Sequence, residues 1–215
     1  MNKKVLLIFG TRPEAIKMAP VFHALKALPD LFVEVCATGQ HREMLDQVIE
    51  LFDIDITEDL NVMTKEQDLF SLTSILLMKL RSLLTENRPD CILVHGDTTT
   101  SMAAALAGFY LEIPVGHVEA GLRTHNLRSP FPEEFNRRVS GMIAHWHFAP
   151  TQLNRDNLLA EQVSDSQIFV TGNTVVDALH HIRARIESDI DLKTRIQNQL
   201  SRNLKFDPQK CFYLK

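Results

Sequence analysis

The amino-acid sequence predicts an α/β fold in which helices cover both faces of a parallel sheet. Short β-branched or apolar runs alternate along the chain with longer helical patterns, which is typical of such sheets. Between Asp68 and Asn87, leucines recur every three or four residues, as they do on the buried side of an amphipathic helix. Apolar residues make up 45% of the 215 residues and charged residues 23%, which is enough apolar material for a substantial core.

The elements follow one another in a regular order. The predicted strands are Lys4–Phe9, Phe32–Ala37, Cys91–His95, Pro114–Val118, His147–Ala149 and Gln167–Val170. The predicted helices are Pro13–Ala27, Arg42–Phe52, Asp68–Asn87, Thr98–Leu111, Glu133–Ala144 and Gln152–Glu161. Pro13 suits the first turn of a helix, because a missing N–H costs nothing there.

The last part of the sequence differs from the rest. A polar break at Thr171–Thr174 precedes an amphipathic helix that begins near Val175, and a charged stretch then runs to about Lys205. The apolar run Cys211–Leu214 is predicted to begin another strand, with Lys215 directly after it. An α/β chain seldom stops inside an apolar strand, so we interpret the sequence as interrupted.

Charge and hydropathy disfavour several classes of protein. The formal net charge is −4 and the basic residues are scattered, so no basic field is available for a nucleic acid backbone. No apolar stretch approaches the roughly 20 residues that span a bilayer. Cys36, Cys91 and Cys211 lie far apart in apolar runs, which favours buried thiols in a reducing compartment and hence a cytoplasmic protein.

Metal and dinucleotide sites are not predicted. His145 with His147, and His180 with His181, lack a third ligand at a recognisable spacing, so neither pair indicates a metal site. The loop after the first strand is neither a Walker A loop nor a Gly-x-Gly-x-x-Gly turn, which gives no support to an ATPase or a dinucleotide oxidoreductase.

Polar clusters follow the first four predicted strands. Because the carboxyl ends of parallel strands meet at one edge of a sheet, these clusters predict a shared site there. The clusters are Gly10–Glu14 with Lys17, Thr38–Arg42, His95–Thr100 and Glu119–Arg123. Arg12 and Lys17 lie beside a helix N-terminus, where they suit a phosphate or pyrophosphate. The alternative is that both are surface charges on that helix.

Candidate carboxylates lie at three points of this predicted edge. Asp97 and Glu119 each end an apolar strand, and Glu133 begins a helix after the rigid Ser129–Pro132 approach. Carboxylates gathered at one cleft suit proton transfer to and from a substrate. Structural alternatives stay open. Asp97 suits an N-cap, and Glu133 suits favourable charge at a helix N-terminus. An i,i+4 ion pair in that helix fits Glu134 with Arg138 better than Glu133 with Arg137.

The chain resembles a known family in segments that extend from its start to about residue 180. The segments are Phe9–Pro20, Gly39–Leu45, Val94–Thr100, His117–Thr124, Pro132–Arg137 and Gly172–Asp177. Together they resemble the bacterial non-hydrolysing UDP-N-acetylglucosamine 2-epimerases. These are isomerases that interconvert UDP-N-acetylglucosamine and UDP-N-acetylmannosamine without NAD or a metal, and so without a cofactor.

The resemblance implies a Rossmann-like sheet that forms the first domain of a two-domain, GT-B-like architecture. It divides the chain into an N-terminal domain, 1–170, and a segment, 171–215, that holds a linker, a helix and the truncated start of the second nucleotide-binding domain. The family's Gly-His-Arg segment and its uridine-binding residues are absent from the sequence. The full-length family implies a homodimer that supplies UDP-N-acetylmannosamine for surface polysaccharide synthesis.

By resemblance, the site has catalytic carboxylates and a set of substrate-binding side chains. The catalytic residues are Asp97, Glu119 and Glu133, and the substrate-binding residues are Arg12, Lys17, Gln40, His41 and Arg137. Two alternatives stay open: a non-catalytic remnant that binds a nucleotide-sugar or a partner, and a hydrolysing epimerase that releases UDP and N-acetylmannosamine.

Overall fold

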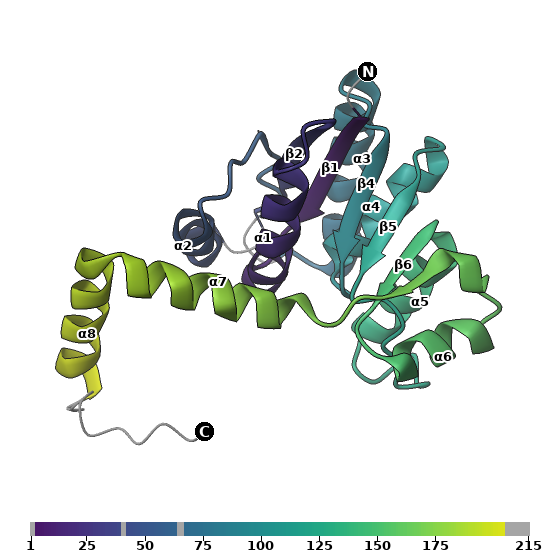
Figure 1. Cartoon of the computed structure of the whole chain (residues 1–215). Coiled ribbons are helices and arrows are strands. Elements are labelled where there is room, and N and C mark those ends of the chain that lie inside the picture. Colours follow the sequence, from purple (N-terminus) through teal and green to yellow (C-terminus); the bar gives the residue numbers. More distant parts are fainter. Residues whose placement is uncertain (1–2, 40–41, 64–66, 205–215) are drawn as a thin grey trace.

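The computed structural model describes residues 3–39, 42–63 and 67–204. Within them, one seven-stranded sheet has the order β3-β2-β1-β4-β5-β6-β7, and every neighbouring pair of strands is parallel (Figure 1). The strands are β1 Lys3–Phe9, β2 Leu31–Ala37, β3 Glu58–Asp59, β4 Cys91–His95, β5 Val115–Val118, β6 Trp146–Ala149 and β7 Ile168–Val170. The predicted α/β class, with its parallel Rossmann-like sheet, is confirmed.

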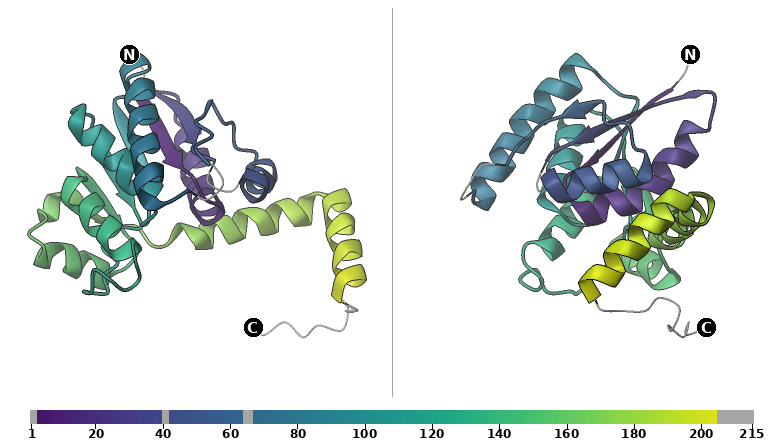
Figure 2. Two further views of the ribbon diagram at one scale, coloured as in Figure 1. Left: turned by 180° about the vertical axis from the view of Figure 1, so that it is seen from behind. Right: turned by 90° about the vertical axis from the view of Figure 1, so that its left-hand side faces the viewer.

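Helices cover both faces of the sheet (Figures 1 and 2). The α-helices are α1 Arg12–Lys26, α2 Arg42–Phe52, α3 Leu69–Glu86, α4 Thr99–Tyr110, α5 Glu133–Ile143, α6 Gln152–Ala160, α7 Thr174–Ser188 and α8 Ile190–Leu204. Crossovers between parallel strands are right-handed, so the change in strand direction after β3 moves the helices from one face to the other.

The strand side chains build a separate core on each face. Along β1, Val5, Leu7 and Phe9 pack with the α1 and α2 side chains, whereas Leu6 and Ile8 pack with those of α3 and α4. This alternation follows from the two-residue period of a strand, and burial on both faces explains why β1 is a continuous apolar run. The sheet therefore has no solvent-exposed face at β1.

The strand order places a crevice at the ends of β1 and β4. The chain leaves β1 towards β2 and leaves β4 towards β5, in opposite directions along the sheet. Loops diverge at such a switch point, and ligands of open α/β sheets bind there. The loops concerned are those that begin at Gly10 and Gly96.

The predicted helices and strands agree with the structure to within one or two residues, and the prediction omitted β3, α8 and the short 3₁₀ helix Asp165–Gln167. The edge strand β3 consists of two acidic residues, so it carries no apolar signal. The segment from Ile190 to Leu204 was predicted as a charged stretch and is helix α8. Asp189 Oδ1 accepts from the N–H groups of Asp191 and Leu192, a cap that was readable in the sequence. The predicted strand Cys211–Leu214 lies outside the described residues.

Helix α7 leaves the sheet after β7 and crosses α1 and α2 (Figure 1). The His181 ring stacks on the His23 ring, with centroids 4.9 Å apart, and also contacts Phe52. Arg185 Nη1 donates to the Leu51 carbonyl at the end of α2. The helix after the polar break is therefore tied to the first helices of the chain. Among the described helices, none has the length and apolar character needed to span a membrane.

Candidate active site

Glu119 lies directly after β5 and collects partners from distant parts of the chain. Its Oε1 lies 2.5 Å from Lys17 Nζ on α1, and the Asn173 side-chain amide donates to the same oxygen at 3.1 Å. Its Oε2 lies 3.5 Å from His95 Nε2. The backbone of Glu119 is left-handed, with φ of 64°, which is uncommon for a residue with a side chain. The surroundings hold this carboxylate in one place.

The imidazole beside Glu119 is neutral. Burial, together with the nearby Lys17 ammonium, lowers the pKa of His95 from 6.5 to about 3. The Glu119–His95 contact is therefore no ion pair at neutral pH, and Lys17 supplies the positive charge. His95 was named in the sequence only as part of a polar cluster, yet it is one of the groups nearest to Glu119.

Asp97 lies after β4, the strand next to β5, and is paired with a cation from α5. Arg137 Nη2 lies 2.6 Å from Asp97 Oδ2, and the Asn136 amide donates to the Asp97 carbonyl at 2.8 Å. The alternative that Asp97 caps the next helix is wrong. The N-cap of α4 is Thr98, whose hydroxyl accepts from the Ser101 N–H.

Glu134, and not Glu133, holds α5 and the preceding turn together. Its fully buried carboxylate accepts from the N–H groups of Thr124 and His125, and also pairs with Arg137 and Arg138. Burial opposes its ionisation, but these hydrogen bonds outweigh burial and hold the pKa of Glu134 below its usual value. The predicted Glu134–Arg138 pair is confirmed. Glu134 also orients Arg137 towards Asp97.

Glu133 lies at the first turn of α5 with a half-buried side chain. Among the described residues, its Oε2 is buried and has no hydrogen-bond partner. A buried carboxylate oxygen without a donor is unusual in a folded protein. This acceptor is therefore unused within the described part of the chain.

The sequence reasoning missed the role of Glu14. Its buried carboxylate accepts from the Gly10 and Thr11 N–H groups and from the Thr98 hydroxyl, at 3.1, 2.8 and 2.7 Å. Burial raises the pKa of Glu14. Thr11 and Glu14 form a capping box, a signal that the sequence already contained. Glu14 thereby joins the loop that precedes Lys17 to the loop that carries Asp97.

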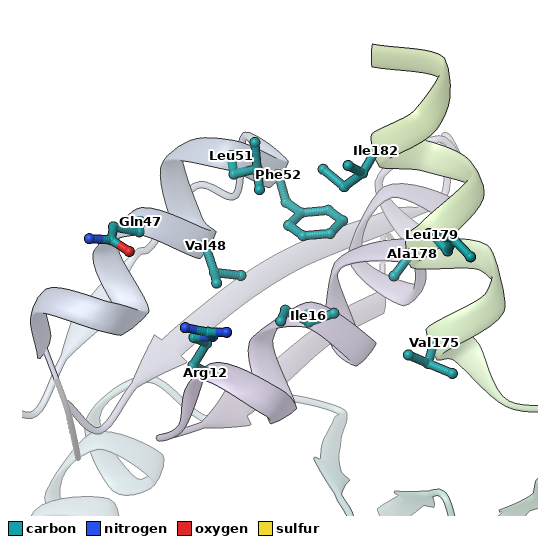
Figure 3. A pocket seen from close by; sticks show the side chains of 10 residues that line it. All are labelled: Arg12, Ile16, Gln47, Val48, Leu51, Phe52, Val175, Ala178, Leu179 and Ile182. Atoms are coloured by element: carbon teal, nitrogen blue, oxygen red, sulfur yellow. The ribbon is translucent and has the colours of Figure 1, made fainter. Parts of the chain in front are cut away.

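Arg12 is the first residue of α1 and is exposed. It lines a groove of about 350 Å³ between α1, α2 and α7, where Figure 3 shows it close to Ile16 and Val48. The groove is lined mainly by apolar side chains and by none of the three candidate carboxylates, so it differs from the polar crevice at the strand ends. Gln40 and His41, the other predicted binding residues, lie outside the described residues.

The histidine pairs that were considered for metal binding have other neighbours. His145 packs edge-on against Trp146, and His181 stacks on His23. In the part of the chain that the structure describes, no group of three or more His, Cys, Asp or Glu side chains is arranged to hold a metal ion.

This fold and site define a class: a Rossmann-like domain, of the kind paired in two-domain GT-B-like enzymes, with charged side chains at its β1, β4 and β5 ends. A lipopolysaccharide outer core galactosyltransferase shares the fold, with a TM-score of 0.57 and 15% identity over 79% of this chain and 45% of that one. Identity this low supports the fold alone.

The chain belongs to the UDP-N-acetylglucosamine 2-epimerase family, whose sequence profile matches residues 23–208. A UDP-N-acetylglucosamine 2-epimerase of Escherichia coli (strain K12) is 54% identical over 98% of this chain and 55% of its own length. The crystal structure of a UDP-GlcNAc 2-epimerase from Neisseria meningitidis, bound to UDP-GlcNAc, matches with a TM-score of 0.87 and 50% identity. That match covers 92% of this chain and 54% of the other. The chain spans about half the length of the curated relatives it matches.

Proposed function

We propose that this chain is the carboxylate-bearing half of an isomerase that interconverts UDP-N-acetylglucosamine and UDP-N-acetylmannosamine. The observation that carries the proposal is a pair of carboxylates at neighbouring strand ends, each held against a cation: Glu119 with Lys17, and Asp97 with Arg137. Proton transfer needs carboxylates, and loss of a nucleoside diphosphate needs positive charge. Cytoplasmic location and a supply of UDP-N-acetylmannosamine for surface polysaccharide belong to the same proposal.

The reaction needs proton transfer on both faces of the sugar. A carboxylate takes the proton from C2, the C1–O bond breaks, and UDP leaves a 2-acetamidoglucal. A second acid returns a proton to C2 from the opposite face, and UDP adds again at C1. Asp97, Glu119 and Glu133 are the proposed proton carriers. Arg12, Lys17 and Arg137 are proposed to bind the nucleotide-sugar and its departing charge, together with Gln40 and His41.

The proposed domain division follows the end of the sheet. We assign 1–170 to the first domain, because β7 ends at Val170 and completes the sheet. We assign 171–215 to a linker, a helix and the start of a second domain. The packing of α7 on α1 supports a linker role, since it fixes the direction in which the chain leaves the first domain.

A fused enzyme tests this function. It joins this chain to the part of the Escherichia coli relative that the chain does not match. We expect NMR to show UDP-N-acetylglucosamine converting reversibly into its C2 epimer. The 215-residue chain alone should give no repeated turnover, because one wall of a cleft cannot keep the glycal and UDP together until they recombine.

Other outcomes of that experiment separate the alternatives. Net release of UDP and N-acetylmannosamine would identify a hydrolysing epimerase. Binding of the nucleotide-sugar without chemistry in the fused enzyme would identify a binding module.

A homodimer is also part of the proposal, and an exposed apolar face supports it. Helices α3, α4 and α5 pack side by side on one face of the sheet (Figure 2). They carry exposed apolar side chains: Phe70, Met78, Phe109, Tyr110 and Met142. An apolar face of this kind marks an interaction surface in a water-soluble domain.

Placing charge on this face should separate the subunits. We expect Tyr110→Glu combined with Met142→Glu to convert a dimer to a monomer in sedimentation velocity, because each buried charge would lack a partner. Leu28→Glu, at an exposed apolar position between α1 and β2, is the control and should leave the dimer intact. A wild-type monomer, or an unchanged dimer in the double variant, would contradict this interface.

A further inference from the structure

Helix α7 begins at the candidate catalytic carboxylate. Asn173, its N-cap, accepts from the Val175 N–H through Oδ1 at 3.0 Å and donates through Nδ2 to Glu119 Oε1 at 3.1 Å. We propose that Asn173 is a positioning residue that couples the start of α7 to the charge and position of Glu119. The proposal rests on the proposed function only where it treats Glu119 as a group that moves protons.

The two bonds of Asn173 leave its amide one orientation. The Val175 N–H is a donor and requires the amide oxygen. The Glu119 carboxylate is an acceptor when ionised and requires the amide nitrogen. A rotated amide would oppose both partners. The same side chain therefore caps the helix and donates to the carboxylate in one orientation of its amide.

Asn173 differs from the other neighbours of Glu119 in where it comes from. Lys17 and His95 belong to α1 and β4, which are anchored in the sheet and its covering layer, whereas Asn173 follows the sheet's last strand. Lys17 and Asn173 share Oε1. A shift of α7 would therefore change the contacts of that oxygen while the sheet stays as it is.

Packing alone does not fix the first turns of α7. The groove of about 350 Å³ in Figure 3 separates Val175 and Leu179 from Val48 on α2. Val175 and Leu179 are 42% and 68% exposed, whereas Ala178 is 2% exposed. Further along the helix, His181 and Arg185 make close contacts with α1 and α2. The hydrogen bonds of Asn173 therefore hold the N-terminal end of α7 together with the packing of Ala178 in the core.

Protonation of Glu119 weakens its contact with Asn173. When Glu119 takes up a proton, it loses its charge, and a hydrogen bond to a neutral carboxyl is weaker than one to a carboxylate. The start of α7 is then held less firmly. By the same coupling, movement of α7 withdraws a donor from Glu119. The segment that leads out of the first domain and the proton carrier thus influence each other.

Two substitutions that keep the cap isolate this coupling. Asn173→Ser keeps an N-cap oxygen but removes the donor to Glu119, and Asn173→Asp keeps the cap but places a second carboxylate against Glu119. Both are made in the 215-residue chain, alone and with Glu119→Gln. Hydrogen–deuterium exchange of the amides of residues 174–182 reports how firmly α7 is held.

We expect Asn173→Asp to exchange at least about tenfold faster than Asn173→Ser, because both variants lack the donor to Glu119 but only aspartate adds a charge that repels it. With Glu119→Gln the two should agree within about twofold, because the repelling charge is gone. The Asn173 side-chain amide signal in ¹⁵N NMR should also move on Glu119→Gln.

Equal exchange of both variants in both backgrounds would overturn the proposal and leave Asn173 as a helix cap only. An Asn173 side-chain amide signal whose chemical shift is unchanged by Glu119→Gln would also overturn the proposal. Neither measurement needs turnover, so a failed coupling and a failed epimerase assignment give different results.

Discussion

In the fused enzyme, Glu119→Gln is expected to lower kcat by about 10²–10⁴, the usual contribution of a positioned acid or base. Glutamine keeps the size of the side chain and an acceptor for Lys17 and Asn173, but it cannot carry a proton. Affinity for UDP-N-acetylglucosamine should change by only a few fold. The measurements are steady-state kinetics and calorimetric binding.

Asp97→Asn and Glu133→Gln should follow the same pattern. The control is Asp90→Asn, which removes a carboxylate at the amino end of β4, where Asp90 pairs with Lys3. The control should keep normal turnover, because it lies at the opposite edge of the sheet. If Asp97, Glu119 and Glu133 variants all turned over as fast as Asp90→Asn, the three would be structural residues.

The second large effect is a loss of stability in acid, caused by buried neutral histidines. His95, His117 and His147 lie on the neighbouring strands β4, β5 and β6 and are almost fully buried. Burial is the main reason that the pKa values of His95 and His117 fall to about 3 and that of His147 to about 4. His117 Nε2 lies 2.7 Å from the Gly96 carbonyl oxygen, which can only accept, so Nε2 carries the proton of the neutral ring and Nδ1 is unprotonated.

The direction of the effect follows from the lowered pKa values. Below pH 6.5 the unfolded chain protonates these histidines while the folded chain does not, so the free energy of unfolding falls as pH falls towards 4. Each proton contributes about 1.4 kcal/mol per pH unit. Glu14, whose pKa burial raises, binds its proton at a higher pH in the folded chain than in the unfolded chain, which acts in the opposite direction. The three histidines together account for a loss of about 5 kcal/mol between pH 6.5 and 5, comparable to the whole stability of many domains.

Urea unfolding of the 215-residue chain at pH 7.5 and pH 5 measures this loss. His147→Gln should reduce the difference in the free energy of unfolding between pH 7.5 and pH 5 by about a third, because one of the three histidines is removed. His180→Gln is the control, since His180 is exposed on α7 and should leave the difference unchanged. Equal stability at both pH values would show that these histidines are protonated in the folded chain.

Local patterns in the sequence were sufficient for the order of elements and for the edge of the sheet that carries the polar clusters. Apolar periodicity decides helix or strand without reference to distant residues, so β1, α3 and β4 were predicted to within one or two residues. β3 and α8 were missed because their apolar signal is short or diluted by charge. The family could also be identified from the sequence, because each of its characteristic segments is a continuous stretch of the chain.

The choice of partner for each charged side chain was decided only by the tertiary structure. Arg137 can reach Glu133 or Glu134 by helical spacing, and it pairs with Glu134 and with Asp97 on another element. Asp97 suits a helix cap, yet Thr98 takes that place. Asn173 meets Glu119 across 54 positions of sequence. Coulombic and hydrogen-bond energies depend on separation in space, and chain spacing sets that separation only within a single helix or strand.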